Sequence, residues 1–204
     1  MKTFILFING SPRKKGRTVE YLKEVIKGAK KEKAQTKLIH LIDFKILPCL
    51  GCYSNSPKDC TFPCKQKDDM EKIYPLLLKA QGFVIGSPSY WYSVSGLVKN
   101  FVDRLTCLEN NGYLIEKKIF AAISCAEESG GDEVSHYLIS AFNEMGCIIP
   151  PFATPFFNEN EKGTWQKKEL EILGRNIVRL AKVIKKVNFF EILMVLNYFL
   201  IKNN

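Results

Sequence analysis

The sequence predicts an α/β protein with a parallel β-sheet that is covered by helices on both faces. Short apolar runs typical of buried strands alternate along the chain with amphipathic helical patterns. Three unusual loops each follow one of these apolar runs. In sheets of this kind, ligands bind outside the carboxyl ends of the strands, so we expect the three loops to converge on one ligand.

The length and composition suit one globular domain. A chain of 204 residues can bury a full core, and 46% hydrophobic and 25% charged residues are ordinary for such proteins. Much of the formal net charge of +9 lies on lysine-rich helices. Because no basic stretch alternates with aromatic residues as in a nucleic-acid groove, we expect a solvated basic face and no nucleic-acid partner.

The first apolar run, residues 4–8, ends abruptly in a polar, basic loop, and a helical pattern begins at Thr18, a good N-cap residue. The loop amides and the helix N-terminus point at one spot, where the helix dipole favours negative charge. Ser11 and Thr18 can add hydroxyl donors, and Arg13 and Arg17 can add positive charge. The loop glycines match neither the P-loop nor the dinucleotide fingerprint, so we interpret the loop as the seat of one phosphate.

The other elements follow in regular alternation. The second loop, residues 87–93, carries an aromatic triplet at a strand end, which favours ligand contact over a packed corner. The third loop covers residues 125–131. Pro75 lies inside the helix expected over residues 68–78, and it is expected to kink or shorten that helix. Strands are expected over residues 4–8, 36–42, 82–86, 118–124 and 147–152, and helices over 19–31, 68–78, 95–108, 132–145 and 167–186.

These motifs resemble those of the NAD(P)H-dependent FMN reductases and multimeric flavodoxin-like proteins, a group that includes the iron-sulfur flavoproteins. The resemblance implies a flavodoxin-like three-layer sandwich over residues 1–186, with a five-stranded parallel sheet of order 2-1-3-4-5 and bound FMN. The matching pieces are Asn9-Gly-Ser-Pro-Arg13 with Thr18, Cys49-x-x-Cys52 leading to Lys67-Asp-Asp-Met70, Gly86-Ser-Pro-Ser-Tyr-Trp91, Ser95-Gly96, Lys99-Asn100-Phe101 and Asp103-Arg104.

The resemblance also implies which residues contact the cofactor. The first loop would hold the FMN phosphate, the second would line the isoalloxazine ring, and the third would form the opposite wall. The residues are Ser11, Arg13, Arg17 and Thr18 in the first loop, Pro88, Ser89, Tyr90 and Trp91 in the second, and Glu127 and Gly130 in the third, with Ser124 directly before it. No catalytic side chain is required, because the flavin itself accepts the hydride. Asp103 and Arg104 are expected to be structural or to lie at an oligomer interface.

Four of the seven cysteines, Cys49, Cys52, Cys60 and Cys64, fall within sixteen residues. Four thiolates at this density suit an iron-sulfur cluster or zinc, and a reduced, metal-free loop that covers the flavin or an oligomer contact is the third interpretation. The iron-sulfur members of the family have two residues between their second and third cysteines, a position that is Asn55 here. Cys60 can replace that ligand if the loop folds back, so a [4Fe-4S] cluster, zinc and no metal stay open.

The leading functional interpretation is an FMN-dependent oxidoreductase that passes electrons from NAD(P)H through FMN to a small acceptor such as a quinone or flavin. The alternative is a flavoprotein electron carrier, with or without an iron-sulfur cluster, that exchanges electrons with a redox protein. A non-catalytic flavin-binding module is the third. An odd number of cysteines and no recognisable secretory signal favour a reducing, cytoplasmic setting.

The C-terminal extension, residues 187–204, begins with a strongly apolar segment of fifteen residues, 187–201. That is shorter than the roughly twenty residues of a membrane span, yet too apolar for a free tail. We expect it to pack as a helix on a partner subunit or on its own domain, and to help hold a homodimer or larger homo-oligomer. Attachment to a membrane surface is the alternative.

Overall fold

The computed structural model describes residues 2–158 and 164–186. The apolar segment 187–201 lies outside the described residues, so its expected helix and oligomer contact are not tested. Among the described residues, no helix has both the length and the apolar character needed to cross a membrane.

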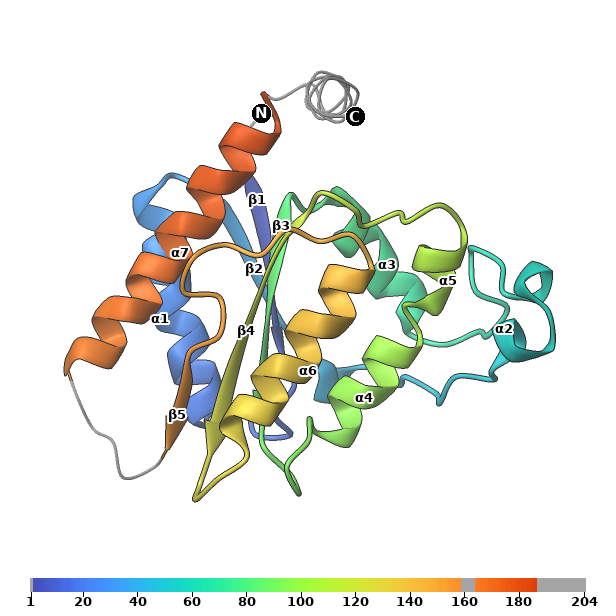
Figure 1. Ribbon diagram of the computed structural model, residues 1–204, viewed down its shortest axis with the longest axis horizontal. Coiled ribbons are helices and arrows are strands. Elements are labelled where there is room, and N and C mark those ends of the chain that lie inside the picture. The colour runs from blue at the N-terminus through green and yellow to red at the C-terminus, as the bar shows by residue number, and fades with distance from the viewer. Residues whose placement is uncertain (1, 159–163, 187–204) are drawn as a thin grey trace, which may run out of the picture.

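A five-stranded parallel sheet forms the centre of the fold (Figure 1), in the order β2-β1-β3-β4-β5. This order confirms the flavodoxin-like arrangement implied by the resemblance. The strands are β1 (Phe4–Asn9), β2 (Gln35–His40), β3 (Gly82–Pro88), β4 (Ile119–Ala126) and β5 (Phe156–Asn158). Because β1, β3 and β4 are neighbours and parallel, their carboxyl ends open onto the same edge of the sheet.

The helices cover both faces of this sheet, and alternate residues of β1 show how the two layers divide. Ile5 and Phe7 pack with α1 (Arg17–Lys31) and α7 (Thr164–Ile184) on one face. Leu6 and Ile8 belong to the larger cluster on the other face. The helices of that second layer are α3 (Met70–Lys79), α4 (Gly96–Asp103), α5 (Thr106–Asn110) and α6 (Gly131–Glu144).

The fifth strand differs from the sequence prediction. Residues 147–152 were expected to form it, but Ile148 makes only an isolated bridge to Ile119, and β5 lies further along the chain. Pro150 and Pro151 explain the difference, because they have no N–H to donate to a strand ladder. Regular pairing with β4 begins only after them, at Phe156.

One predicted helix is divided in the structure. The helix expected over 95–108 breaks into α4 and α5 around Arg104, whose carbonyl accepts a 2.8 Å hydrogen bond from the Tyr74 hydroxyl. Pro75, in contrast, does not shorten α3, which continues to Lys79.

Glycines set the distance between α1 and α7. A Cβ atom at Gly28 would lie 2.0 Å from the Glu171 carbonyl oxygen, and one at Gly174 would lie 2.0 Å from the Val25 carbonyl oxygen. No side chain fits at either position without moving a backbone. This close contact holds α1, and therefore its N-terminus, in place against the sheet.

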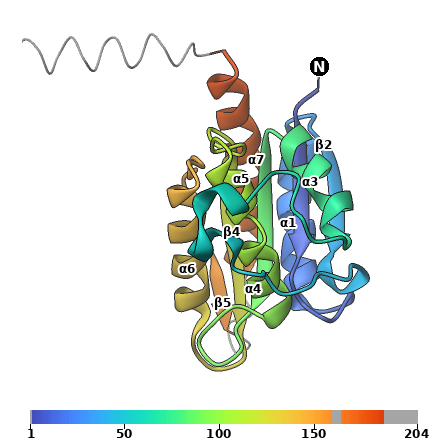
Figure 2. The same cartoon turned by 90° about the vertical axis from the view of Figure 1, so that its right-hand side faces the viewer.

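The four-cysteine segment forms a side branch of the fold. It contains the short helix α2 (Cys52–Asn55) and a 3-10 turn over Pro57–Asp59, and it lies beside α4 and α5 (Figures 1 and 2). The four-cysteine segment therefore lies next to α4 and α5, away from the edge of the sheet where the carboxyl ends of β1, β3 and β4 meet.

Candidate functional site

A cavity of about 340 Å³ opens at the carboxyl ends of β1, β3 and β4. All three unusual loops contribute to its wall. Of the residues that the resemblance implies, the cavity brings together Ser11, Arg13, Arg17, Thr18, Pro88, Ser89, Tyr90 and Glu127. It does not include Trp91, Ser124 or Gly130, and it adds Lys15, Gly16, Glu20, Cys125 and Ala126.

The first loop owes its shape to Asn9, a fully buried residue at the end of β1. Its Oδ1 accepts from the Ser11 amide at 3.1 Å, and its Nδ2 donates to the Ser11 carbonyl at 3.1 Å. The Ser11 hydroxyl in turn accepts from the Arg13 amide at 3.1 Å. The Asn9 side chain also lies 3.0 Å from Nδ1 of His40. Sequence reasoning did not assign this role, although a polar residue directly after a buried apolar run was a usable signal.

The start of α1 faces this cavity. The helix begins at Arg17, and Gly16 occupies the N-cap position expected for Thr18. Gly16 has no side chain that could cap the helix, so the positive end of the helix dipole is left to another partner. Thr18 instead lies buried in the first turn at the cavity wall. Together with Arg13, these groups make one wall suited to a dianionic phosphate.

The second loop ends in a tight, strained turn. Tyr90 and Ser93 exchange two backbone hydrogen bonds of 2.9 and 3.1 Å, and the two residues between them, Trp91 and Tyr92, have φ angles of 51° and 60°. Left-handed backbone at bulky residues costs about 1–3 kcal/mol each. Trp91 is 96% exposed at the tip of the turn. The structure therefore places Trp91 beside the cavity and not in its wall.

The third loop is held from within and packs on the second. Ser124 is fully buried, and its hydroxyl donates to the Gly131 carbonyl, so it positions the loop and does not face the cavity. Gly130 has φ +84°, and a Cβ there would lie 2.6 Å from the Ser89 hydroxyl oxygen and 3.0 Å from the Tyr92 Cα. A glycine is thus required where the two loops meet.

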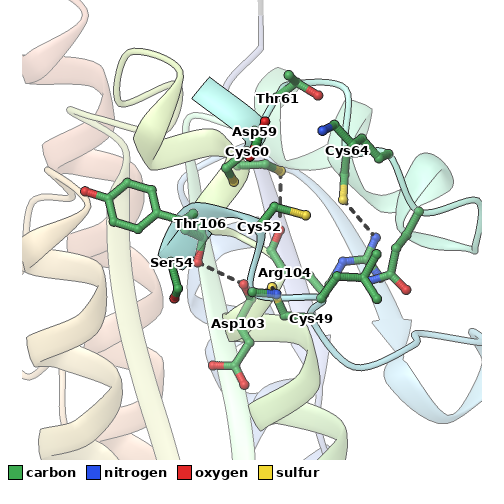
Figure 3. A pocket seen from close by; sticks show the side chains of 16 residues that line it. Cys49, Cys52, Ser54, Asp59, Cys60, Thr61, Cys64, Asp103, Arg104 and Thr106 are labelled. Atoms are coloured by element: carbon green, nitrogen blue, oxygen red, sulfur yellow. Dashed lines mark hydrogen bonds between the residues drawn. The ribbon is translucent and has the colours of Figure 1, made fainter. Parts of the chain in front are cut away.

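A second cavity, of about 210 Å³, is lined by Cys49, Cys52, Cys60 and Cys64 (Figure 3). None of these thiols is in a disulfide. The loop does fold back to bring Cys60 to the others. The Cys60 carbonyl accepts 2.8 Å hydrogen bonds from the side chains of Asn110 and Asn111. Within residues 2–158 and 164–186, no three histidine, cysteine or acidic side chains are placed to hold a metal ion as they stand.

The thiols influence one another electrostatically. Burial raises the pKa of the Cys60 thiol, and the neighbouring Cys49, Cys52 and Cys64 raise it further. Burial also raises the pKa of the Cys107 thiol, which lines the same cavity, to about 11. Several thiolates in this space would repel one another without a cationic partner.

Arg104 supplies one such partner from inside the protein. Its side chain is 0% exposed and pairs with the Asp68 carboxylate, which is 1% exposed. Its Nη2 donates to the Cys64 sulfur at 3.4 Å, and its Nη1 donates to the Leu47 carbonyl at 3.1 Å. Burial alone would raise the pKa of Asp68, but hydrogen bonds from Arg104 and from the Leu47 and Met70 amides lower it below its ordinary value. Sequence reasoning treated Arg104 only as structural or interfacial and missed this contact.

The fold and the first cavity define the class of protein. Residues 3–161 match the family model described as NADPH-dependent FMN reductase, and the chain belongs to this family of flavodoxin-like, FMN-binding oxidoreductases. This confirms the resemblance found in the sequence.

Individual proteins are also similar to this chain. An iron-sulfur flavoprotein of Archaeoglobus fulgidus is 30% identical over 194 residues, which cover 90% of this chain and 94% of the relative. One of Methanocaldococcus jannaschii is 32% identical over 146 residues, covering 71% of this chain and 74% of the relative. Among solved structures, RosB with bound 8-demethyl-8-formylriboflavin-5'-phosphate superposes with a TM-score of 0.77 at 14% identity, covering 99% of this chain and 88% of RosB.

Proposed function

We propose that the protein is an FMN-dependent oxidoreductase that passes electrons from NAD(P)H through bound FMN to a small acceptor such as a quinone or free flavin. The observation that carries this proposal is the cavity at the carboxyl ends of β1, β3 and β4, which is lined by the basic first loop, by Pro88, Ser89 and Tyr90 of the second loop, and by the third loop. Family membership supports the same cofactor.

The residues present fit FMN. The loop shaped by Asn9, the α1 N-terminus without a side-chain cap and the Arg13 guanidinium suit the terminal phosphate. Pro88, Ser89 and Tyr90 form a wall against which a flat ring can lie. When bound, FMN supplies the hydride-accepting atom and the electron transfer, and the protein binds and orients it.

The proposal is tested by adding NADH or NADPH to the protein and following both the oxidation of the nicotinamide and the absorption of the flavin. Protein purified without oxygen is expected to show flavin absorption bands, to lose them on addition of a nicotinamide cofactor, and to recover them with a quinone. Protein stripped of flavin is the control. Flavin that neither NADH nor NADPH reduces, but that a reduced ferredoxin does, would instead support an electron carrier.

A second function, electron transfer through an additional [4Fe-4S] cluster, is favoured by the second cavity. Four thiols that are not in disulfides line it, and the Arg104 guanidinium, which also lines it, has a buried Nε with no hydrogen-bond partner in the part of the chain that the structure describes. We infer that Cys49, Cys52, Cys60 and Cys64 would hold the cluster, which when bound supplies a one-electron centre. The relatives carry iron-sulfur in their names.

Replacing Cys52 by Ser is expected to abolish the bound iron and sulfide while FMN is retained, because a ligand is lost in one cavity and the other is untouched. Iron, acid-labile sulfide and flavin are measured after anaerobic reconstitution. The matched control is Cys147→Ser, a buried cysteine whose sulfur contacts the Ile115 carbonyl, away from this cavity. Wild-type protein with full flavin but no iron or sulfide would support the metal-free alternative.

A further inference from the structure

Arg104 presents a fixed positive charge to the four-thiol cavity from within the protein. The guanidinium cannot lose its proton under ordinary conditions, and its side chain has no access to solvent. Figure 3 shows it beside Cys64, joined to that sulfur by a hydrogen bond of 3.4 Å. Cys64 is therefore distinguished from the other thiols by a charged donor.

The guanidinium has more donors than the surrounding protein uses. Its two terminal nitrogens contact Asp68, Leu47 and Cys64, whereas Nε is buried and has no hydrogen-bond partner among the described residues. Burying a charged donor without an acceptor is costly. Because Arg104 also lines the cavity, its guanidinium lies close to any centre that the four cysteines hold.

Asp68 fixes the position of this charge. Both carboxylate oxygens contact the guanidinium, and the carboxylate is itself held by the Leu47 amide at 2.9 Å and the Met70 amide at 3.0 Å. The pair is thus a rigid dipole whose positive end points to Cys64. A positive group and a negative group that lie side by side should affect a nearby redox centre in opposite directions.

We propose that Arg104 is a positioning residue that raises the reduction potential of the centre bound by the four cysteines, through its hydrogen bond and charge at Cys64. This inference rests on the cluster proposed above. Reduction adds one electron and therefore one negative charge to a four-thiolate centre. Hydrogen bonds to the sulfurs and nearby positive charge stabilise that reduced state more than the oxidised one.

The test measures the midpoint potential by anaerobic titration with dithionite, which supplies the electron, followed by electron paramagnetic resonance. Arg104→Lys keeps the charge but loses the fork that reaches Asp68 and Cys64 together. We expect the equilibrium to shift about tenfold toward the oxidised centre, which is 59 mV for a one-electron couple. Asp68→Asn removes the compensating negative charge and is expected to shift the potential upward. The control is Arg179→Met, which removes an exposed charge paired with Glu32 and should leave the potential unchanged.

The shifts in midpoint potential expected for Arg104→Lys and Asp68→Asn have opposite signs, and this distinguishes the proposed role from a purely structural one. A residue that only braces the loop would shift both variants in the same direction or broaden both spectra alike, and either result would overturn the role of Arg104. Unchanged potentials in both variants with iron retained would do the same. If Arg104→Lys loses iron, the upward or absent shift of Asp68→Asn decides the question. Wild-type protein without iron and sulfide contradicts the cluster itself, a result distinct from an intact cluster that ignores Arg104.

Discussion

Replacing Arg104 by Met is expected to lower the free energy of unfolding by about 3–5 kcal/mol, because it leaves the buried Asp68 carboxylate without its partner. Both side chains are shielded from solvent, at 0% and 1% exposure. The measurement is urea denaturation followed by circular dichroism. The control is Lys99→Met, which breaks an exposed pair with Asp103 and should cost less than about 1 kcal/mol. Equal losses in the two variants would contradict the prediction.

The effect of Arg104→Met should also depend on pH. The folded protein lowers the pKa of Asp68 below its ordinary value of 3.8, so the pair contributes stability above that pH, and this stability is lost as the pH falls through the lowered pKa. In the variant, Asp68 takes up a proton more readily. The difference in stability between wild type and variant is therefore expected to narrow as the pH falls toward about 4 and below it. A difference that stays constant from pH 7 to pH 3 would mean that the carboxylate charge is not involved.

Replacing Ser11 and Arg13 together by Ala is expected to weaken FMN binding at least tenfold. The change removes a hydroxyl donor and a charge-assisted bond, the latter worth about 1.5–3 kcal/mol. It also removes the contact between the Ser11 hydroxyl and the Arg13 amide that shapes the loop. Affinity is measured by titrating the flavin-free protein with FMN and following flavin fluorescence.

A neighbour in the same loop provides the control for this change. Lys14→Ala removes an exposed positive charge that pairs with Asp43 and does not line the cavity, so it should change the affinity little. If the double variant binds FMN as tightly as the wild type, the phosphate lies elsewhere. If Lys14→Ala weakens binding equally, the loop acts only through its general charge.

Local patterns along the chain predicted part of the fold, and contacts between distant residues decided the rest. The alternation of strands and helices and the convergence of three loops could be read along the chain, because periodicity and loop residues are local properties. The position of the last strand could not, since Pro150 and Pro151 displace a run that is otherwise suitable for a strand. The break between α4 and α5 could not be predicted either, because the Arg104 carbonyl there accepts a hydrogen bond from the distant Tyr74 hydroxyl.

By itself the sequence determined the fold class, the order of the strands through its family motifs, and the loops that surround the first cavity. Only the tertiary structure decided which side chains hold the loops in position and which ones face the cavity or the solvent. Asn9 shapes the first loop, Ser124 turns inward, and Trp91 points to solvent because of the turn around it. Arg104 meets Asp68 and Cys64 across 36 and 40 residues of chain. A buried charge finds its partner through the packing of distant segments, and no local pattern specifies that choice.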